Sequence, residues 1–273
     1  QGVQGGQVLA AAVFLPLTYL LSMADFEQWG WRIPFLASVF VLAAAFFIRR
    51  NVEETPAFRQ AAAQGDVASA PIREAISRCW PDMLRVICMA LMNVIPVVTT
   101  IFGAAYAVQP AYGIGMSAAV YLWIPVVGNL LAMLVIPLVG HLSDRIGRRP
   151  PIIIGSVCAG ALSFAYLHAI GSGSVSGAVV LSLLMWGVVY QGYNAVYPSY
   201  YPELFPARNR VSAMAIAQNL GTFLSAMLPA LFAWMAPPGS DHIAMKVGSI
   251  VFAVTLVSAA AAWSARETRW TTP

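Results

Sequence analysis

Charge is scarce in this chain of 273 residues. Only 10% of the residues are charged, whereas 59% are hydrophobic and the mean hydropathy is +0.73. Because ordinary soluble domains carry about 25% charged residues, this composition argues against a large soluble core. The basic residues sit at the ends of apolar runs and form no patch, so we expect no nucleic-acid partner.

The chain also lacks the patterns of several kinds of site. Its three cysteines have no paired spacing, so neither a disulfide framework nor a metal motif follows. The only lysine is Lys246, and the phosphate loop that an ATP-driven pump needs is missing. No cluster typical of a membrane-embedded enzyme and no filter or pore ring typical of an ion channel is visible. We expect no enzyme activity, no cofactor and no metal.

Long hydrophobic runs make up most of the chain. A membrane-spanning helix needs about 20 mostly apolar residues, and eight runs reach or approach that length. We therefore predict an all-α membrane protein with about eight spanning helices. The predicted spans are 3–22, 33–48, 84–107, 117–139, 151–170, 177–198, 212–235 and 243–264.

The basic residues predict the orientation of these helices. With a cytoplasmic N-terminus, thirteen arginines fall on the cytoplasmic side, and only Arg32 and Lys246 fall on the other. Such a bias follows the positive-inside rule. We expect an integral protein of the plasma (inner) membrane with both termini in the cytoplasm and the lipid bilayer as its surroundings.

The lengths of the loops divide the chain unequally. We expect two helices in 1–48, a polar cytoplasmic loop at 49–83, six helices in 84–264 and a cytoplasmic tail at 265–273. Transporters are commonly built from repeated six-helix halves, and the chain begins with Gln1 rather than Met. We therefore expect a twelve-helix protein without its first four helices. A complete eight-helix protein is the alternative.

The densest charge lies in segment 140–150, GHLSDRIGRRP, between two apolar runs. Such charge cannot lie in hydrocarbon, so the segment is predicted to be a tight loop. Gly140 would allow close helix contact and Gly147 a sharp reversal, while Asp144 could accept hydrogen bonds from the N-terminus of a neighbouring helix. The charges that could lock this face by ion pairs are Arg145, Arg148 and Arg149.

Residues 140–149 match G-x-L-[SA]-D-[RK]-x-G-R-[RK], and so resemble the signature loop of the major facilitator superfamily. Segments 29–35 (WGWRIPF), 49–58 (RRNVEETPAF) and 202–210 (PELFPARNR) are similar to its metabolite:proton symporters. Members of that family include permeases for shikimate, α-ketoglutarate, citrate, and proline or betaine. The resemblance covers helices five to twelve and implies the major facilitator fold, without helices one to four or the first signature loop.

The resemblance also implies a gate on the cytoplasmic side. Glu203 and Arg210 follow the sixth run and by analogy face the signature loop. Glu203 would pair with Arg148 or Arg149 when the inner side closes. The alternatives are that Glu203 is a solvated loop acid and that the arginines only anchor the topology.

Polar side chains within the runs predict the solute site, because such groups are costly in a membrane and usually face a cavity or another helix. Tyr190, Asn194 and Tyr197 share one helical face by their spacing, and Pro96 is expected to break the helix near Asn93. Hydrogen-bonded packing between helices is the alternative interpretation. The predicted solute-binding residues are Tyr190, Asn194, Tyr197, Gln218, Asn219, Asn93 and Asn129.

Together these features predict secondary active transport by alternating access, with a proton driving a small polar metabolite such as an organic acid or a betaine. No Asp, Glu, Lys or Arg lies in the middle of any run, so the proton-coupling residue is expected in the missing helices. A truncated fragment that does not transport is the alternative, and a membrane-embedded enzyme is less favoured.

Overall fold

The structure is a computed structural model that describes residues 2–51, 71–206 and 208–269. Every regular element within these ranges is a helix, which confirms the predicted all-α fold. The chain divides into two compact units, Gln1–Ser69 and Ala70–Pro273. The second unit carries the signature loop and the predicted solute-binding residues.

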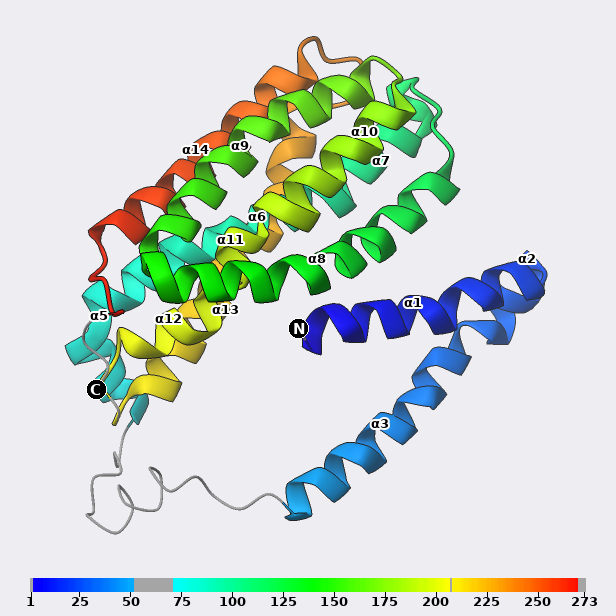
Figure 1. Cartoon of the computed structure of the whole chain (residues 1–273). Helices are drawn as coiled ribbons and strands as arrows, with labels where there is room; N and C mark the ends of the chain where they lie inside the picture. Colours follow the sequence, from blue (N-terminus) through cyan, green and yellow to red (C-terminus); the bar gives the residue numbers. More distant parts are fainter. Residues whose placement is uncertain (1, 52–70, 207, 270–273) are drawn as a thin grey trace. The chain divides into compact units, whose positions relative to one another are not determined.

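The first unit is a helical hairpin (Figure 1). Its two long helices, α1 (Gly2–Leu20) and α3 (Arg32–Asn51), are joined by the short α2 (Met23–Asp25) and the π-helical η1 (Phe26–Gly30). No residue of α3 is buried, and the side chain of Phe40 is 80% exposed. An apolar surface of this extent suits lipid or another protein rather than water.

The second unit contains six long helical spans, four of them regular or nearly so and two interrupted. The regular spans are α8 (Ala118–Ile146), α9 (Arg149–Gly171), α13 (Arg210–Met235) and α14 (Ile243–Ser264). The first span consists of α5 (Pro71–Ala90), η2 (Leu91–Asn93), α6 (Val94–Val97), η3 (Val98–Phe102) and α7 (Gly103–Val108), and a short η4 (Pro110–Tyr112) follows it. The fourth span consists of α10 (Val175–Ser182), η5 (Leu183–Val189), α11 (Gln191–Asn194) and α12 (Tyr197–Glu203).

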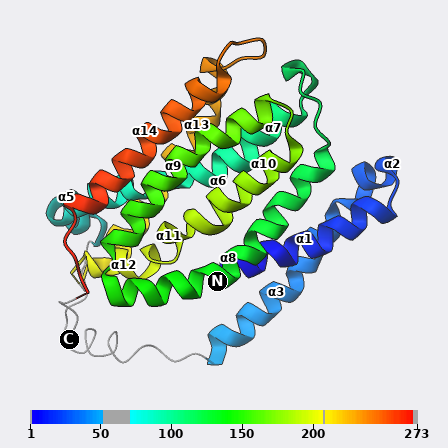
Figure 2. The same ribbon diagram turned by 45° about the horizontal axis from the view of Figure 1, so that its top comes forward.

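Small residues bring these spans close together. A Cβ atom at Gly192 on α11 would lie 2.5 Å from the Pro151 carbonyl oxygen of α9, and one at Gly221 on α13 would lie 2.5 Å from the Ile87 carbonyl oxygen of α5. Close backbone approach at glycine is typical of helix packing in membranes. Helices α9 and α14 also lie side by side (Figures 1 and 2).

Seven helices in the described residues are long and apolar enough to cross a membrane. The run predicted at 3–22 contains a shorter apolar helix, Gly2–Leu17. These helices confirm that the chain is an all-α protein with about eight apolar helical segments. The seven longer helices are Phe26–Asn51, Ile76–Val108, Ala118–Ile146, Arg149–Gly171, Val175–Glu203, Arg210–Met235 and Ile243–Ser264.

The first and fourth spans of the second unit depart from regular α-helix. The 3₁₀-helical η2 and the π-helical η3 flank α6, which contains Pro96, so the helix is irregular where the sequence predicted a break. In the fourth span the π-helical η5 precedes Tyr190. Single π-helical turns inside α-helices are frequent at functional sites, and these two spans carry Asn93 and Tyr190.

Two boundaries differ from the sequence-based expectation. The charged segment 140–150, expected as a tight loop, is helical except around Gly147, because α8 continues to Ile146 and α9 begins at Arg149. The loop predicted at 49–83 overlaps helix at both ends, because α3 continues to Asn51 and α5 begins at Pro71. Buried Cys79, Met83 and Val86 recur at intervals of four and three residues, which is the spacing of one helical face. A search for apolar runs misses such a helix start because its other face is polar. The rest of the predicted loop, 52–70, lies outside the described residues.

Candidate functional site

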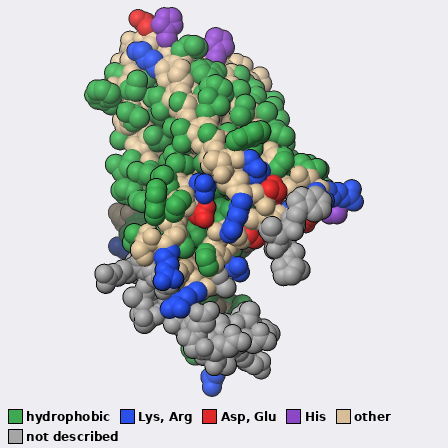
Figure 3. Space-filling view, turned by 90° about the vertical axis from the view of Figure 1, so that its left-hand side faces the viewer, with side chains coloured by type: hydrophobic (Ala, Val, Ile, Leu, Met, Phe, Trp, Pro, Cys, Tyr) green, Lys and Arg blue, Asp and Glu red, His purple; other side chains and the backbone are tan. Residues whose placement is uncertain are grey.

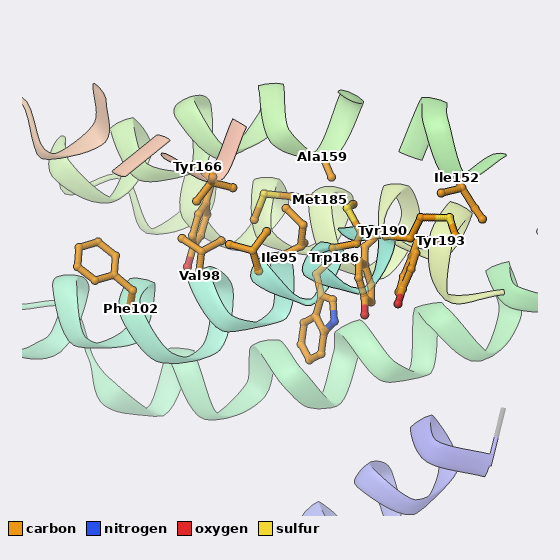
Figure 4. Close-up of a cluster of buried hydrophobic side chains, with 14 of the residues drawn as sticks. Ile95, Val98, Phe102, Ile152, Ala159, Tyr166, Met185, Trp186, Tyr190 and Tyr193 are labelled. Carbon is orange, nitrogen blue, oxygen red and sulfur yellow. The ribbon is translucent and has the colours of Figure 1, made fainter. Parts of the chain in front are cut away.

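Four tyrosines of the fourth span form the first candidate site. We call Tyr190, Tyr193, Tyr197 and Tyr201 the tyrosine cluster. The ring centroids of Tyr190 and Tyr193 are 5.7 Å apart, and the rings of Tyr193 and Tyr197 stack at 5.2 Å. The hydroxyl of Tyr201 donates to the hydroxyl of Tyr193 at 3.2 Å. The close-up shows Tyr190 and Tyr193 next to each other with their hydroxyls directed to the same side (Figure 4).

Hydrogen bonds connect this cluster to two other spans. The Tyr190 hydroxyl donates to Asn93 Oδ1 at 3.0 Å. Asn93 Nδ2 in turn donates to the Ala90 carbonyl at 2.8 Å and to Thr222 Oγ1 of α13 at 3.3 Å. Gln218, one turn before Thr222 on α13, has a buried Oε1 without a hydrogen-bond partner among the described residues. The first span, the fourth span and α13 therefore meet at one neutral polar network.

The tyrosines at the centre of the network are largely closed to solvent. The side chains of Tyr193 and Tyr201 are fully buried and that of Tyr190 is nearly so. The amides and hydroxyls around them are more open: Asn93, Asn194, Tyr197 and Gln218 are partly exposed and Thr222 is exposed. The groups that a solute would meet are phenols and amides, which offer hydrogen bonds without a fixed charge.

The structure brings together some predicted solute-binding residues and separates others. Tyr190, Tyr197 and Asn93 belong to the network, and Gln218 lies on the α13 face that reaches it. The amides of the other three bond within their own helices, neither to the network nor to another helix. Asn194 Nδ2 donates to Gln191 Oε1 at 2.9 Å, Asn219 Nδ2 to the Ala215 carbonyl at 2.8 Å, and Asn129 Nδ2 to the Pro125 carbonyl at 2.7 Å.

Tyr193 is the residue of the cluster that the sequence reasoning missed. The predicted face continued from Tyr190 to Asn194 with the i, i+4 spacing of a regular helix. Tyr193 lies in the same short helix α11 as Asn194, and its ring contacts those of both Tyr190 and Tyr197. The signal was present as tyrosines at 190, 193, 197 and 201, because intervals of three and four both place side chains on one helical face.

The second candidate site is the arginine end, which we define by Asp144, Arg148, Arg149, Glu203 and Glu267. Charged side chains gather in the lower half of the view, away from the purple histidine side chains at its top (Figure 3). The turn between α8 and α9 is made by Gly147 with φ of 105°, a left-handed value that favours glycine. A Cβ atom at this position would lie 2.7 Å from Glu267 Oε2, so the carboxylate also requires glycine here.

Glu267 caps the N-terminus of α9. The Arg148 N–H donates to Oε1 at 2.8 Å and the Arg149 N–H to Oε2 at 3.1 Å. Two further backbone N–H groups, of Thr268 and Arg269, also donate to Oε1. Burial alone would raise the pKa of Glu267, but the four backbone donors outweigh it and lower that pKa below its ordinary value of 4.5.

Arg148 joins three acceptors. Its Nη1 donates to Asp144 Oδ1 at 2.6 Å and to Ser143 Oγ at 2.9 Å, and its Nη2 lies 3.5 Å from Glu203 Oε1. Glu203 also accepts a hydrogen bond from Thr268 Oγ1. The predicted pairing of Glu203 with Arg148 is therefore present as a contact, and its role as a gate stays a prediction.

Other predicted residues of the signature loop behave differently. Asp144 was expected to accept hydrogen bonds from a neighbouring helix N-terminus, but Glu267 occupies the N-terminus of α9, and Asp144 is 61% exposed and pairs with Arg148. Gly140 was expected at a close helix contact, yet a Cβ there would meet nothing within 4 Å. Arg145 is exposed and makes no ion pair within the described part of the chain.

Arg149 and Arg210 bond to backbone rather than to acids. Arg149 Nε donates to the Ala262 carbonyl at 3.0 Å, and its guanidinium lies 5.4 Å from the ring centroid of Trp263. Arg210 Nε donates to the Phe205 carbonyl at 3.4 Å. Arg149 therefore ties the start of α9 to the end of α14.

Glu267 was not predicted from the sequence. It lies 118 or more residues from its main partners, so no local pattern places it against the signature loop. One signal was available: the pair Glu267-Thr268 follows the last apolar run as Glu54-Thr55 follows the second. An acid repeated after two apolar runs predicts an equivalent position at the ends of the two helices.

Comparison with known proteins decides the family. The profile described as Major Facilitator Superfamily matches residues 2–230. The chain belongs to the major facilitator superfamily. Membership confirms the sequence resemblance and points to a membrane transporter rather than an enzyme. The chain is accordingly an integral membrane protein.

Curated relatives within the superfamily carry names of solute transporters. A proline/betaine transporter of Salmonella typhimurium is 29% identical over 93% of this chain and 52% of its own length. A glycine betaine/proline/ectoine/pipecolic acid transporter of Dickeya dadantii is 30% identical over 86% and 48%, and a shikimate transporter of Escherichia coli is 28% identical over 93% and 60%. The chain thus spans about half to three fifths of these relatives. No solved structure matches it.

Proposed function

We propose that this chain supplies the last eight helices of a proton-coupled symporter for a small polar metabolite in the inner membrane. The complete protein would have twelve helices and would work by alternating access, with both termini of this chain in the cytoplasm. The main support is the meeting of two interrupted spans at the hydrogen bond between Tyr190 and Asn93. Binding sites of secondary transporters are typically formed by discontinuous helices near the middle of the membrane.

The tyrosine cluster favours a zwitterion or a small organic acid as the solute. Aromatic faces attract quaternary ammonium groups, and phenol and amide groups donate hydrogen bonds to carboxylates. The printed names of the relatives include proline, betaine and shikimate transporters, which fall in the same chemical range. The solute would first meet the partly exposed groups around the buried tyrosines, among them Asn93, Tyr197 and Gln218.

The arginine end would act as the inner gate. Arg148 connects the end of α8 to the end of the fourth span through Glu203, and Glu267 connects the same turn to the chain beyond α14. Each exposed or half-exposed ion pair contributes little by itself, typically about 0–1 kcal/mol. A network of them is enough to bias two transporter states that differ by only a few kcal/mol.

Proton coupling would depend on residues outside this chain. The middle of every apolar run lacks Asp, Glu, Lys and Arg, and a proton relay in a membrane requires a titratable group. We place that group in helices one to four. The chain by itself would then be a fragment that does not transport, which is the second candidate function.

Solute uptake into liposomes with an inward-directed pH gradient tests both statements. The longer protein that carries this chain should accumulate glycine betaine, proline or shikimate, and a proton ionophore should abolish the accumulation. The 273-residue chain alone should accumulate none of them. Uptake that ignores the pH gradient would overturn symport, and gradient-driven uptake by the chain alone would overturn the proposed dependence on further helices.

A further inference from the structure

A second polar cavity lies at the opposite end of the six-helix unit from the arginine end. It has a volume of about 270 Å³ and lies between the ends of α7, α9 and α14. Its polar lining includes Tyr106, His168, Ser240 and His242, and no carboxylate side chain lines it. We call it the histidine pocket. The proposed transport function makes no use of it.

The N-terminus of α14 opens into this pocket without a cap. Ile243 and Ala244 line the pocket, and neither backbone N–H donates a hydrogen bond within the described residues. No side chain caps the helix, and its first turn contains no acidic residue. Unsatisfied N–H groups at a helix N-terminus, together with the helix dipole, attract anions. At the arginine end of the same unit, the equivalent place on α9 is filled by the Glu267 carboxylate.

A second group points to a ligand independently of the helix end. Tyr106 is only 7% exposed, and no hydrogen bond of its hydroxyl is found among the described residues. The hydroxyl lies at the wall of the pocket beside Gly171, where a Cβ atom would come within 2.7 Å of it. A ligand in the pocket could therefore accept the hydrogen bond of this phenol.

The carbonyls of the last turn of α9 already have partners, because they accept from the N–H groups of Ser172, Gly173 and Ser174. The donors at the pocket are two backbone N–H groups, a phenol, a serine hydroxyl and two imidazoles, and an imidazole donates from both nitrogens when it is protonated. The nearby charges are Asp241 and Lys246, which are exposed and have opposite signs, so they leave the local charge balanced.

We infer that the histidine pocket binds a phosphate-class oxyanion, held by the N-terminus of α14, the Tyr106 hydroxyl and the two imidazoles. The anion has two possible sources, free inorganic phosphate and the headgroup of an anionic phospholipid, because the pocket opens at an end of membrane-spanning helices. The site is separate from the tyrosine cluster and from the arginine end.

The test uses the 273-residue chain purified in detergent and titrated with potassium phosphate, with potassium chloride at equal ionic strength as the reference. Thermal melting should rise with phosphate beyond the chloride reference. Tyr106→Phe removes only one hydroxyl and His168→Ala one imidazole, and each should weaken the apparent phosphate affinity about tenfold, as expected for a hydrogen bond to a charged group. His141→Ala is the matched control, because this exposed histidine lies at the arginine end.

The lipid source has its own measurement. Native mass spectrometry of the chain loaded with phosphatidylglycerol should detect one retained lipid that is lost in Tyr106→Phe and His168→Ala but kept in His141→Ala. Displacement of that lipid by inorganic phosphate would identify one shared site, and retention against phosphate would identify the lipid as the source. The inference is overturned if neither phosphate nor lipid binds the wild-type chain, or if both variants bind them as the wild type does.

Discussion

The fourth span contacts its neighbours at two positions, the tyrosine cluster and the arginine end. The contacts are neutral hydrogen bonds at the first position and ion pairs at the second. In the cluster, Tyr190 reaches Asn93 through neutral groups in a nearly closed interior. At the end of that span, Glu203 reaches Arg148 through charges that stay partly exposed. Burying a charge is costly, whereas a neutral hydrogen bond is tolerated in low dielectric. Removing a cluster group should therefore change packing, and removing an end group should change the balance of states.

The largest expected effect concerns transport and comes from Asp144→Asn. Asp144 pairs with Arg148 at 2.6 Å while remaining mostly exposed, so the change removes a gate charge without opening the core. We expect uptake by the longer protein to fall at least about tenfold, which corresponds to roughly 1.4 kcal/mol. The surface-labelled protein level should not change. Wild-type uptake rates in the variant would show that Asp144 has no part in the gate.

The next effect concerns stability and comes from Glu267→Ala. The change leaves four backbone N–H groups without their carboxylate, two of them at the N-terminus of α9. Loss of a helix cap typically costs about 1–2 kcal/mol, so the free energy of unfolding in detergent should fall by that amount. The control is Asp82→Ala, whose partly exposed pair with Arg85 should contribute less than about 1 kcal/mol. Equal losses in both variants would show that the Glu267 cap contributes no more to stability than an ordinary exposed ion pair.

A smaller loss of stability is expected from Tyr190→Phe. The change removes the hydrogen bond to Asn93 Oδ1 and leaves the ring contacts in place. The free energy of unfolding should fall by about 0.5–1.5 kcal/mol, and the loss should not depend on salt because the bond is neutral. Tyr197→Phe is the matched control, since the Tyr197 hydroxyl makes no hydrogen bond to the described residues. A salt-dependent loss, or equal losses in the two variants, would contradict the neutral network.

The smallest expected effect is a pH dependence that separates the two regions. The pKa of Glu267 is lowered in the fold, so its charge contributes stability above its unfolded value of about 4.5, and this contribution is lost as the pH falls through the folded value. The difference in melting temperature between the wild type and Glu267→Gln should be constant from neutral pH down to about pH 5 and then shrink in acid. Tyr190→Phe should show no such change. If the difference in melting temperature between the wild type and Glu267→Gln grew in acid, the pKa of Glu267 would be raised in the fold rather than lowered.

The sequence predicted those features that depend on local pattern. Apolar runs predicted the spans, and the charged segment at 140–149 predicted the turn at Gly147. The contact between Glu203 and Arg148 followed from the family resemblance. Asn93 and Tyr190 were both expected at the solute site, and their hydrogen bond brings them together across 97 positions of sequence.

The sequence did not predict features that depend on distant contacts or on irregular helix geometry. Glu267 docks on a turn far away in the chain, and the tail that carries it has no periodic pattern. Tyr193 was missed because residues three and four positions after Tyr190 share one helical face, and only the ring contacts and the bond of the Asn194 amide to Gln191 distinguish them. The early start of α5 was missed because only one face of this helix is buried. Its other face is polar, so the mean hydropathy of the segment is low. Each of these features depends on how side chains pack, which the composition of the segment does not reveal.

The π-helical segment η5 has a consequence for changes in chain length. A wide turn of this kind accommodates one residue more than the α-helix around it, so a single deletion within Leu183–Val189 would restore regular geometry. Because the wide turn absorbs that residue, the following part of the span would keep nearly the same side towards its neighbours. An extra residue that stayed in regular α-helix would instead rotate the following part by about 100°, since an α-helix has 3.6 residues per turn. The π-helical segment therefore allows a span with one residue more to keep Tyr190 on the side of Asn93.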